Sequence, residues 1–180
     1  MPELILPDGR VQPSFLTAMK EFQAEGRGGT SDNHSMLGRE IQLWGGRWED
    51  PAAFAEYAAW LRADAQEDSS RPPGFVPATT MWWADGDEYL GRIAIRHRLT
   101  PSLLLLGGHI GYDVRPSARR RGHATAMLAA ALVVARGLGI DRVLITCRED
   151  NVGSRKVIEA NGGVLDDVRD GILRFWASTG

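Results

Sequence analysis

The sequence predicts an α/β protein built around one mixed sheet. Three observations support this: helix-like segments dominate the first third of the chain, three strand-like segments follow one another from Ala78 to Val114, and helix and strand alternate after that. Elements in this order pack as layers, with helices covering the faces of a sheet. The 180 residues, 43% of them apolar, suffice for a single core. We therefore expect one domain over residues 1–180.

The first third of the chain predicts one short strand and two helices. An apolar run at Glu3–Leu6, closed by Pro-Asp-Gly, indicates the strand. Ser14 is placed to cap a helix that runs to about Glu25, and Pro51 opens a second helix of sequence AAFAEYAAWLRADA. Residues 26–38 are rich in glycine and polar side chains, which predicts a loop, and residues 67–77 are charged and then proline-rich, which indicates a linker.

The central and last parts of the chain supply most of the expected sheet. Ile93 and Ile95 alternate with other residues as in a half-buried strand, and Asp85-Gly86-Asp87 suits a hairpin turn before it. We expect strands at 78–84, 88–99, 105–114 and 140–147, helices at 119–136 and 152–160, and short strands at 164–165 and 172–176.

Composition excludes several classes of function. A net charge of -2 argues against a nucleic-acid partner, and the arginine cluster at 115–121 lacks interleaved aromatic residues. The single cysteine, Cys147, excludes an internal disulfide, and the four histidines lack metal-ligand spacing, so no metal is expected. No apolar run approaches the ~20 residues of a membrane span, and the N-terminus does not resemble a signal peptide, so we expect a cytoplasmic protein without a membrane partner.

The two halves of the chain carry opposite charge. Residues 1–90 hold seven Lys/Arg against fifteen Asp/Glu, a balance of -8, whereas residues 91–180 hold fourteen against eight, a balance of +6. This asymmetry suggests that the second half handles an anion.

One motif points to the kind of anion. Arg119, Gly122 and Ala124 fit the pattern Q/R-x-x-G-x-G/A between a predicted strand and an alanine-rich helix. The pattern alone is weak, since residues 23–28 fit it too. At a strand–helix junction, however, backbone N–H groups and the helix dipole converge on one point, which suits a pyrophosphate. The alternative is an ordinary turn with solvated arginines.

Two longer segments carry a family resemblance. The segments GGHIGYDVRPSARRRGHATAML and LITCREDNVGSRKVIEANGG, in this order, resemble the GNAT superfamily of acetyl-CoA-dependent N-acetyltransferases, in particular a subgroup described as predicted acetyltransferases. The resemblance covers about residues 78–176. It implies a mixed, mostly antiparallel central sheet that splays between its fourth and fifth strands, flanked by about four helices.

The resemblance also implies a binding site for acetyl-CoA. The backbone of Tyr112 to Val114 would pair with the pantetheine arm, and main-chain N–H groups of the turn at 119–125 would hold the pyrophosphate. Asn151 would bond the pantetheine or orient the acceptor, or act as a plain helix N-cap. The cofactor residues expected on this basis are Tyr112, Asp113, Val114, Arg119, Arg120, Arg121, Gly122, His123, Ala124, Thr125, Asn151 and Ser154.

The proton chemistry is less clearly marked. The tyrosine that usually serves as the acid in this superfamily is replaced by Ile158, so Cys147, Tyr112 or a water would have to substitute. His97 and His109 are the candidate bases, because pairing of their strands would set them opposite each other, and a histidine near neutral pKa suits deprotonation of an ammonium. The alternative for both is a structural histidine bonded to loop backbone.

The expected function is transfer of an acetyl group from acetyl-CoA to a primary amine in a ternary complex. The alternative is an acyl-CoA-binding sensor without turnover. The acceptor is a small-molecule or peptide amine that the sequence does not identify, although the acidic first half favours a cationic one. The tryptophans either line its pocket or fill the core. We expect a monomer, or a homodimer paired through an apolar edge strand at 172–176.

Overall fold

The computed structural model describes residues 1–30, 32 and 35–180; Ser31, Asn33 and His34, part of the expected loop, lie outside the described residues. Seven strands form one sheet in the order β1-β2-β3-β4-β5-β7-β6. All neighbouring pairs are antiparallel except β4 and β5, which are parallel. The strands are β1 (Glu3–Ile5), β2 (Ala78–Asp85), β3 (Glu88–Arg96), β4 (Ile110–Val114), β5 (Arg142–Arg148), β6 (Val164–Arg169) and β7 (Ile172–Ser178).

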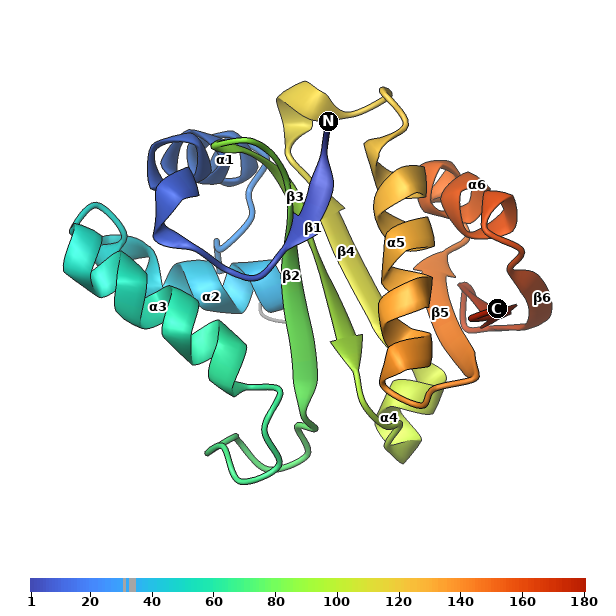
Figure 1. The fold of residues 1–180 in the computed structure, drawn as a ribbon. Helices are drawn as coiled ribbons and strands as arrows, with labels where there is room; N and C mark the ends of the chain where they lie inside the picture. Colours follow the sequence, from blue (N-terminus) through green and yellow to red (C-terminus); the bar gives the residue numbers. More distant parts are fainter. Residues whose placement is uncertain (31, 33–34) are drawn as a thin grey trace.

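Helices cover both faces of this sheet, as Figure 1 shows. The first three lie on one face, α5 and α6 lie on the other, and the short α4 lies between β3 and β4 in the chain. The helices are α1 (Gln12–Ala24), α2 (Met36–Trp44), α3 (Pro51–Ala63), α4 (Pro101–Leu105), α5 (His123–Gly137) and α6 (Val152–Ala160).

The two faces have separate cores. On the α5 side, Ile93 and Ile95 of β3 pack with Met127 and Leu128 of α5 in an aliphatic cluster. On the α1–α3 side the core is aromatic. The ring of Phe15 lies 5.0 to 5.8 Å from five other rings, those of Trp48, Phe54, Tyr57, Trp82 and Tyr89. These buried rings hold the first three helices against β2 and β3, so the core-filling interpretation is correct for Trp48 and Trp82.

Two helices were not expected from the sequence. The described residues form six α-helices rather than about four, the additional ones being α2 and α4. Ser35 caps α2 by accepting from the N–H of Gly38, and Thr100 caps α4 by accepting from the N–H of Leu103. The expected strand at 105–114 is therefore wrong in its first half, because Leu105 ends α4 and β4 begins only at Ile110.

Two further boundaries differ from expectation. The helix expected at 119–136 begins at His123, because Arg120 and Gly122 adopt the left-handed conformation and form a turn before it. The strand expected at the edge, 172–176, is wrong as an edge: β7 pairs with β5 on one side and with β6 on the other, so a dimer cannot pair through it. Among the described residues, no helix has the length and apolar character needed to span a membrane.

Candidate functional site: a cleft at the splay between β4 and β5

The sheet opens between β4 and β5, as expected. The two strands pair only at Ile110 and Ile145 and then diverge. On its other side β4 stays paired with β3, with Gly111 opposite Ala94 and Asp113 opposite Arg92. Hydrogen bonds from Arg96 N to His109 O and from Arg115 N to Leu90 O show which residues of β4 direct their backbone N–H and C=O groups toward β3. Alternation then turns the N–H and C=O groups of Tyr112 and Val114 toward the opening, where an extended ligand can pair with them.

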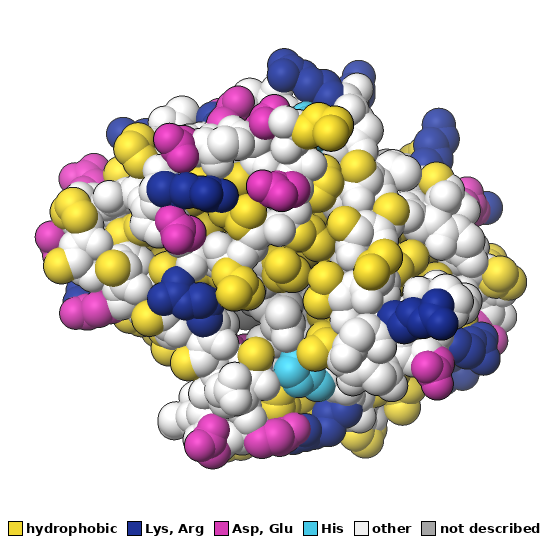
Figure 2. All heavy atoms as spheres, in the orientation of Figure 1, with side chains coloured by type: hydrophobic (Ala, Val, Ile, Leu, Met, Phe, Trp, Pro, Cys, Tyr) yellow, Lys and Arg dark blue, Asp and Glu magenta, His cyan; other side chains and the backbone are white. Residues whose placement is uncertain are grey.

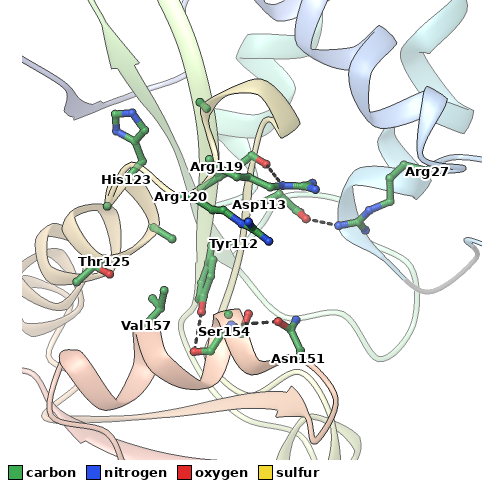
Figure 3. A pocket seen from close by; sticks show the side chains of 15 residues that line it. Arg27, Tyr112, Asp113, Arg119, Arg120, His123, Thr125, Asn151, Ser154 and Val157 are labelled. Atoms are coloured by element: carbon green, nitrogen blue, oxygen red, sulfur yellow. Dashed lines mark hydrogen bonds and ion pairs between the residues drawn. The ribbon is translucent and has the colours of Figure 1, made fainter.

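A cavity of about 660 Å³ occupies the splay. Eleven of the twelve expected cofactor residues line it, and Arg121 is the exception. Figure 3 shows side chains from β4, the turn before α5, and α6 converging on this space from different parts of the chain. The wall also includes four residues outside those twelve: Arg27, Ala118, Gly153 and Val157.

The turn before α5 is shaped to bind an anion. Arg120 has φ 63° and Gly122 has φ 81°, which places two left-handed residues around the start of the helix. The first hydrogen bond of the helix runs from Ala126 N to Gly122 O at 3.1 Å, so the N–H groups of His123, Ala124 and Thr125 precede it. A Cβ on Gly122 would meet no atom within 4 Å, so the space beside the backbone is open. Successive N–H groups around an open space form a concave anion site.

The four arginines around this turn are not equally available to bind an anion. Arg115 is buried and pairs with Glu21 of α1, and Arg119 pairs with Glu25 at 2.7 Å. Among the described residues, only Arg120 and Arg121 of this cluster have no carboxylate within ion-pair distance. The expectation that the whole cluster serves an anion therefore needs correction, since two of its four arginines hold the turn against α1.

The start of α6 closes the cleft on the other side. Asn151 caps the helix by accepting from Ser154 N at 3.0 Å, so the plain N-cap interpretation is correct. The side chain still lines the cavity, which leaves its amide group available to a ligand. A Cβ on Gly153 would lie 3.7 Å from the Asn151 Oδ1, with no closer neighbour, so this glycine leaves an open wall.

Arg27 is the wall residue that sequence analysis missed. It follows α1 in the glycine-rich segment and reaches across the cleft to Asp113 of β4, with which it forms an ion pair (Figure 3). Burial raises the pKa of Asp113, while the guanidinium groups of Arg27, Arg92 and Arg119 act in the opposite direction. No sequence pattern indicated this contact, because the two residues lie 86 positions apart.

A comparison with known families fits this geometry. The family model described as an acetyltransferase (GNAT) domain matches residues 32–164, which is most of the chain. The chain belongs to the GNAT acetyltransferase family. It is accordingly an acyltransferase with the mixed α/β fold of that family.

Solved structures of other GNAT proteins share the fold. RimJ of Mycobacterium smegmatis, in complex with CoA-disulfide, is 18% identical with a TM-score of 0.66, over 98% of this chain and 81% of that one. The microcin C7 self-immunity acetyltransferase MccE, in complex with acetyl-CoA and AMP, is 13% identical with a TM-score of 0.63, over 98% and 92%. RimL, a ribosomal L7/L12 alpha-N-protein acetyltransferase in complex with coenzyme A, is 17% identical with a TM-score of 0.62, over 98% and 93%. No curated protein matches the sequence significantly.

The two histidines proposed as bases do not reach this GNAT cleft. The register sets His109 opposite Arg96 rather than His97, and a shift of one residue places the two rings on opposite faces of the sheet. His109 Nδ1 accepts from Leu144 N at 2.9 Å, and His97 Nε2 lies 2.8 Å from Thr79 Oγ1. Burial lowers the pKa of both rings. Both rings therefore make structural contacts, although their partners lie in strands β2 and β5 and not in loop backbone.

The candidates for the acid are also separated by the structure. Ile158 is fully buried in the aliphatic core, and Cys147 is buried and does not line the cleft. Tyr112 does line it, and its hydroxyl lies 3.5 Å from the carbonyl of Ser154. Burial raises the pKa of Tyr112 to about 12, so the phenol is protonated at neutral pH. Of the two candidate side chains, Cys147 and Tyr112, only Tyr112 combines a donor proton with a place in the cleft.

A second cavity, of about 410 Å³, lies between α2, the end of α3, the linker at 70–76 and β3. Trp60 lines this space, whereas Trp83 is buried against the α5 side of the sheet. Glu49 is exposed and Asp50 caps α3, and Asp167 pairs with Arg174. Of the six tryptophans, only Trp60 lines the second cavity, and none of these three carboxylates does.

Proposed function

We propose that this GNAT protein transfers an acetyl group from acetyl-CoA to a primary amine in a ternary complex. The observation that carries the proposal is the cleft itself, in which an opened strand pair leads directly to an anion-binding turn at a helix N-terminus. A ligand with a long amide-bearing arm and a pyrophosphate matches both parts. Such a ligand is acetyl-CoA.

Each part of the cleft has a role in this proposal. The backbone of Tyr112 to Val114 pairs with the pantetheine amides. The N–H groups at 121–125, with Arg120 and Arg121 nearby, bind the pyrophosphate. Asn151 and Ser154 contact the arm from α6.

The transfer step needs few side chains. The neutral amine attacks the thioester carbonyl, the C–S bond breaks, and the thiolate leaves. Tyr112 supplies the proton to the thiolate and regains one from solvent, while the attacking nitrogen loses its proton to water. Much of the rate then comes from holding the amine and thioester together. We assign no part in this step to His97 or His109, because each ring has one nitrogen bonded outside the cleft and neither residue lines it.

A charge reversal at the turn tests the cofactor site. Gly122→Glu places a carboxylate where the pyrophosphate is proposed to bind and adds a side chain at a positive φ. We expect acetyl-CoA affinity to fall at least a hundredfold by titration calorimetry. Gly46→Glu is the matched control, since a Cβ there also meets nothing within 4 Å. Unchanged affinity in a folded Gly122→Glu protein contradicts the site.

A sensor that binds acyl-CoA without turnover is the second candidate. It is favoured by one observation, the burial of Ile158 at the position where the superfamily usually places its acid. Thiol release from acetyl-CoA in the presence of a panel of amines distinguishes the two. Amine-dependent release eliminates the sensor, whereas tight binding with no release for any amine favours it.

A further inference from the structure

The second cavity lies beside the cleft, on the α1–α3 face of the sheet. Met36 and Arg96 both line it, and both come within 3.9 Å of the place where a Cβ of Gly111 would stand. Gly111 lies between Ile110, where β4 pairs with β5, and Tyr112, which lines the cleft. The cavity therefore adjoins the point on β4 where the proposed thioester-bearing arm ends its pairing.

Two cations of this cavity lack a carboxylate partner among the described residues. Arg39 contacts only the ring of Phe75, with its guanidinium carbon 4.3 Å from the ring centre. Arg96 donates to the carbonyls of Gly107 and Gly108, each at 3.0 Å, and to Met36 Sδ at 3.2 Å. Burial lowers the pKa of Arg96, and Arg92 lowers it further. An anion in the cavity would offset this unfavourable burial.

The two carboxylates that line the cavity, Asp64 and Glu40, differ in whether they have an oxygen free to bind a ligand. Asp64 is already paired with Arg71 at 2.8 Å. Glu40 is 4% exposed, and its hydrogen bonds from Tyr57 and Arg92 both go to Oε2. Its Oε1 has no partner among the described residues, although Glu40 lines the cavity. Oε1 is not one of the fully buried unpaired atoms, so it is accessible from the cavity, where an unpaired carboxylate oxygen can accept from a donor such as an ammonium.

The remaining wall is apolar. Trp60, Phe75 and Leu103 line the cavity together with the charged groups. A ligand that satisfies all of these walls has an ammonium, an anionic group and an apolar body.

We propose that the second cavity binds the acceptor and that the acceptor is an amine carrying a carboxylate and an apolar side chain, as in a free apolar amino acid. Glu40 binds the ammonium, which releases one proton to water before the neutral amine attacks, and Arg39 and Arg96 bind the carboxylate. This inference rests on the proposed acetyl transfer. It replaces the cationic acceptor suggested by the acidic first half, because most of the acidic groups there are already paired.

Binding of matched ligands tests the proposal. Leucine, phenylalanine and tryptophan are compared with their carboxamides, which keep the amine and side chain but lack the carboxylate. Calorimetric titrations are run with and without CoA, which provides no acetyl group to transfer. At least one of the amino acids should bind about tenfold more tightly than its carboxamide, since a charged hydrogen-bonding pair is lost in the latter.

Variants assign that preference to the cavity. Arg39→Gln should reduce the ratio of the two affinities severalfold, and Arg39→Lys should restore part of it. Arg142→Gln is the matched control, because Arg142 also lies over an aromatic ring, 5.3 Å from that of Trp176, and lines neither cavity. The control should keep the full preference.

Failure of the acceptor assignment can be distinguished from failure of the proposed acetyl transfer. Failure of all three amino acids to bind, equal binding of amino acids and carboxamides, or an unchanged preference in Arg39→Gln overturns the acceptor assignment. Failure of acetyl-CoA to bind, or of any amine to release thiol, instead overturns the proposed transfer. Thiol release supported by the carboxamides and not by the amino acids would point to a peptide N-terminus and against this inference.

Discussion

At the scale of single residues, the proposed chemistry depends most on Tyr112. Its backbone faces the splay, while its side chain lines the cavity and approaches α6 at Ser154. Because burial raises its pKa to about 12, the phenol retains its proton over the pH range in which an acetyl transfer would be measured. In the proposed mechanism one residue thus positions the cofactor arm and supplies a proton, whereas the superfamily usually places the acid on the helix.

Removal of the Tyr112 hydroxyl separates these two roles. In Tyr112→Phe the backbone and ring remain, so affinity for acetyl-CoA should change by less than threefold. The value of kcat should fall by about a hundredfold or more, as for loss of a general acid. Steady-state kinetics with calorimetry measures both quantities. Unchanged kcat would leave water as the proton donor.

His109 is expected to affect stability rather than transfer. Burial and then Arg96 lower its pKa below the ordinary value of 6.5, and its Nδ1 must stay unprotonated to accept from Leu144. The unfolded chain therefore binds a proton at this residue that the folded chain does not. The free energy of unfolding should be unaffected by His109 above pH 6.5 and should fall as the pH drops below it toward the folded pKa.

Replacement by asparagine tests this assignment. His109→Asn keeps an acceptor for the Leu144 N–H and removes the titration. Urea unfolding between pH 5 and 8 should show a smaller loss of stability at the acid end than in the wild type. Part of the loss should remain, because the pKa of His97 is also lowered. Retained acetyl transfer in this variant would exclude His109 as the base.

At the scale of elements, the splay depends on how closely β3 and β4 approach. A Cβ on Gly91 of β3 would lie 2.5 Å from Asp113 O and 3.2 Å from Val114 Cα. No side chain fits there unless the strand moves. The absence of a side chain at Gly91 therefore sets the position of the strand that forms one wall of the cleft.

A single methyl group at this position should disturb both stability and binding. Gly91→Ala should lower the free energy of unfolding by about 1–3 kcal/mol, as overpacking does. It should also weaken acetyl-CoA binding, because Tyr112 and Val114 move with β4. Urea unfolding and calorimetry measure the two effects, and Gly46→Ala is the control at an open position. An unchanged midpoint would show that β4 adjusts without cost.

The same scale shows which elements the sequence can predict. The β2–β3 hairpin, α5 and α6 follow from local signals: a Gly86 turn, an alanine-rich run ended by glycine, and an Asn151 cap. Helix α2 was missed because glycine in its first turn disfavours a helix in isolation. In the structure a Cβ on Gly38 would lie 2.6 Å from Asp32 O, so a tertiary contact requires that glycine.

The site likewise has parts that follow from local sequence signals and parts that depend on tertiary contacts. The shape of the turn proposed to bind the pyrophosphate was predictable, because its residues are consecutive and lie at the junction of a strand and a helix. Arg27 and the second cavity were not, since they depend on how the segment after α1 and the linker at 70–76 fold back on the sheet. Leu105 was misassigned to a strand because an apolar run alone does not distinguish a buried strand from a short exposed helix.

At the scale of the whole molecule, the charge asymmetry between the two halves is largely cancelled by pairing within the structure. On the face in Figure 2, acidic and basic side chains lie interspersed rather than in separate fields. Four ion pairs join an acidic residue of the first half to an arginine of the second half, and one joins an arginine of the first half to an acidic residue of the second. These pairs are Glu21–Arg115, Glu25–Arg119, Glu40–Arg92, Glu67–Arg98 and Asp113–Arg27.

This pairing limits the positive charge available to an anionic cofactor, and release of one pair should increase it. Arg119 lines the cleft, and its guanidinium is shared with Glu25, both side chains being more than 40% exposed. An exposed pair of this kind contributes only about 0.2–1 kcal/mol to stability, so its loss is tolerable.

Glu25→Gln leaves Arg119 beside the turn with no carboxylate to neutralise it. We expect acetyl-CoA to bind about two- to fivefold more tightly to this variant at low salt, and the gain to shrink as salt screens the added charge. Calorimetry at several salt concentrations measures this, with Glu56→Gln as the control, because Glu56 pairs with Arg47 away from the cleft. A variant that binds no better than the wild type at any salt concentration would mean that the turn binds through its backbone alone and that the arginines only hold it in place.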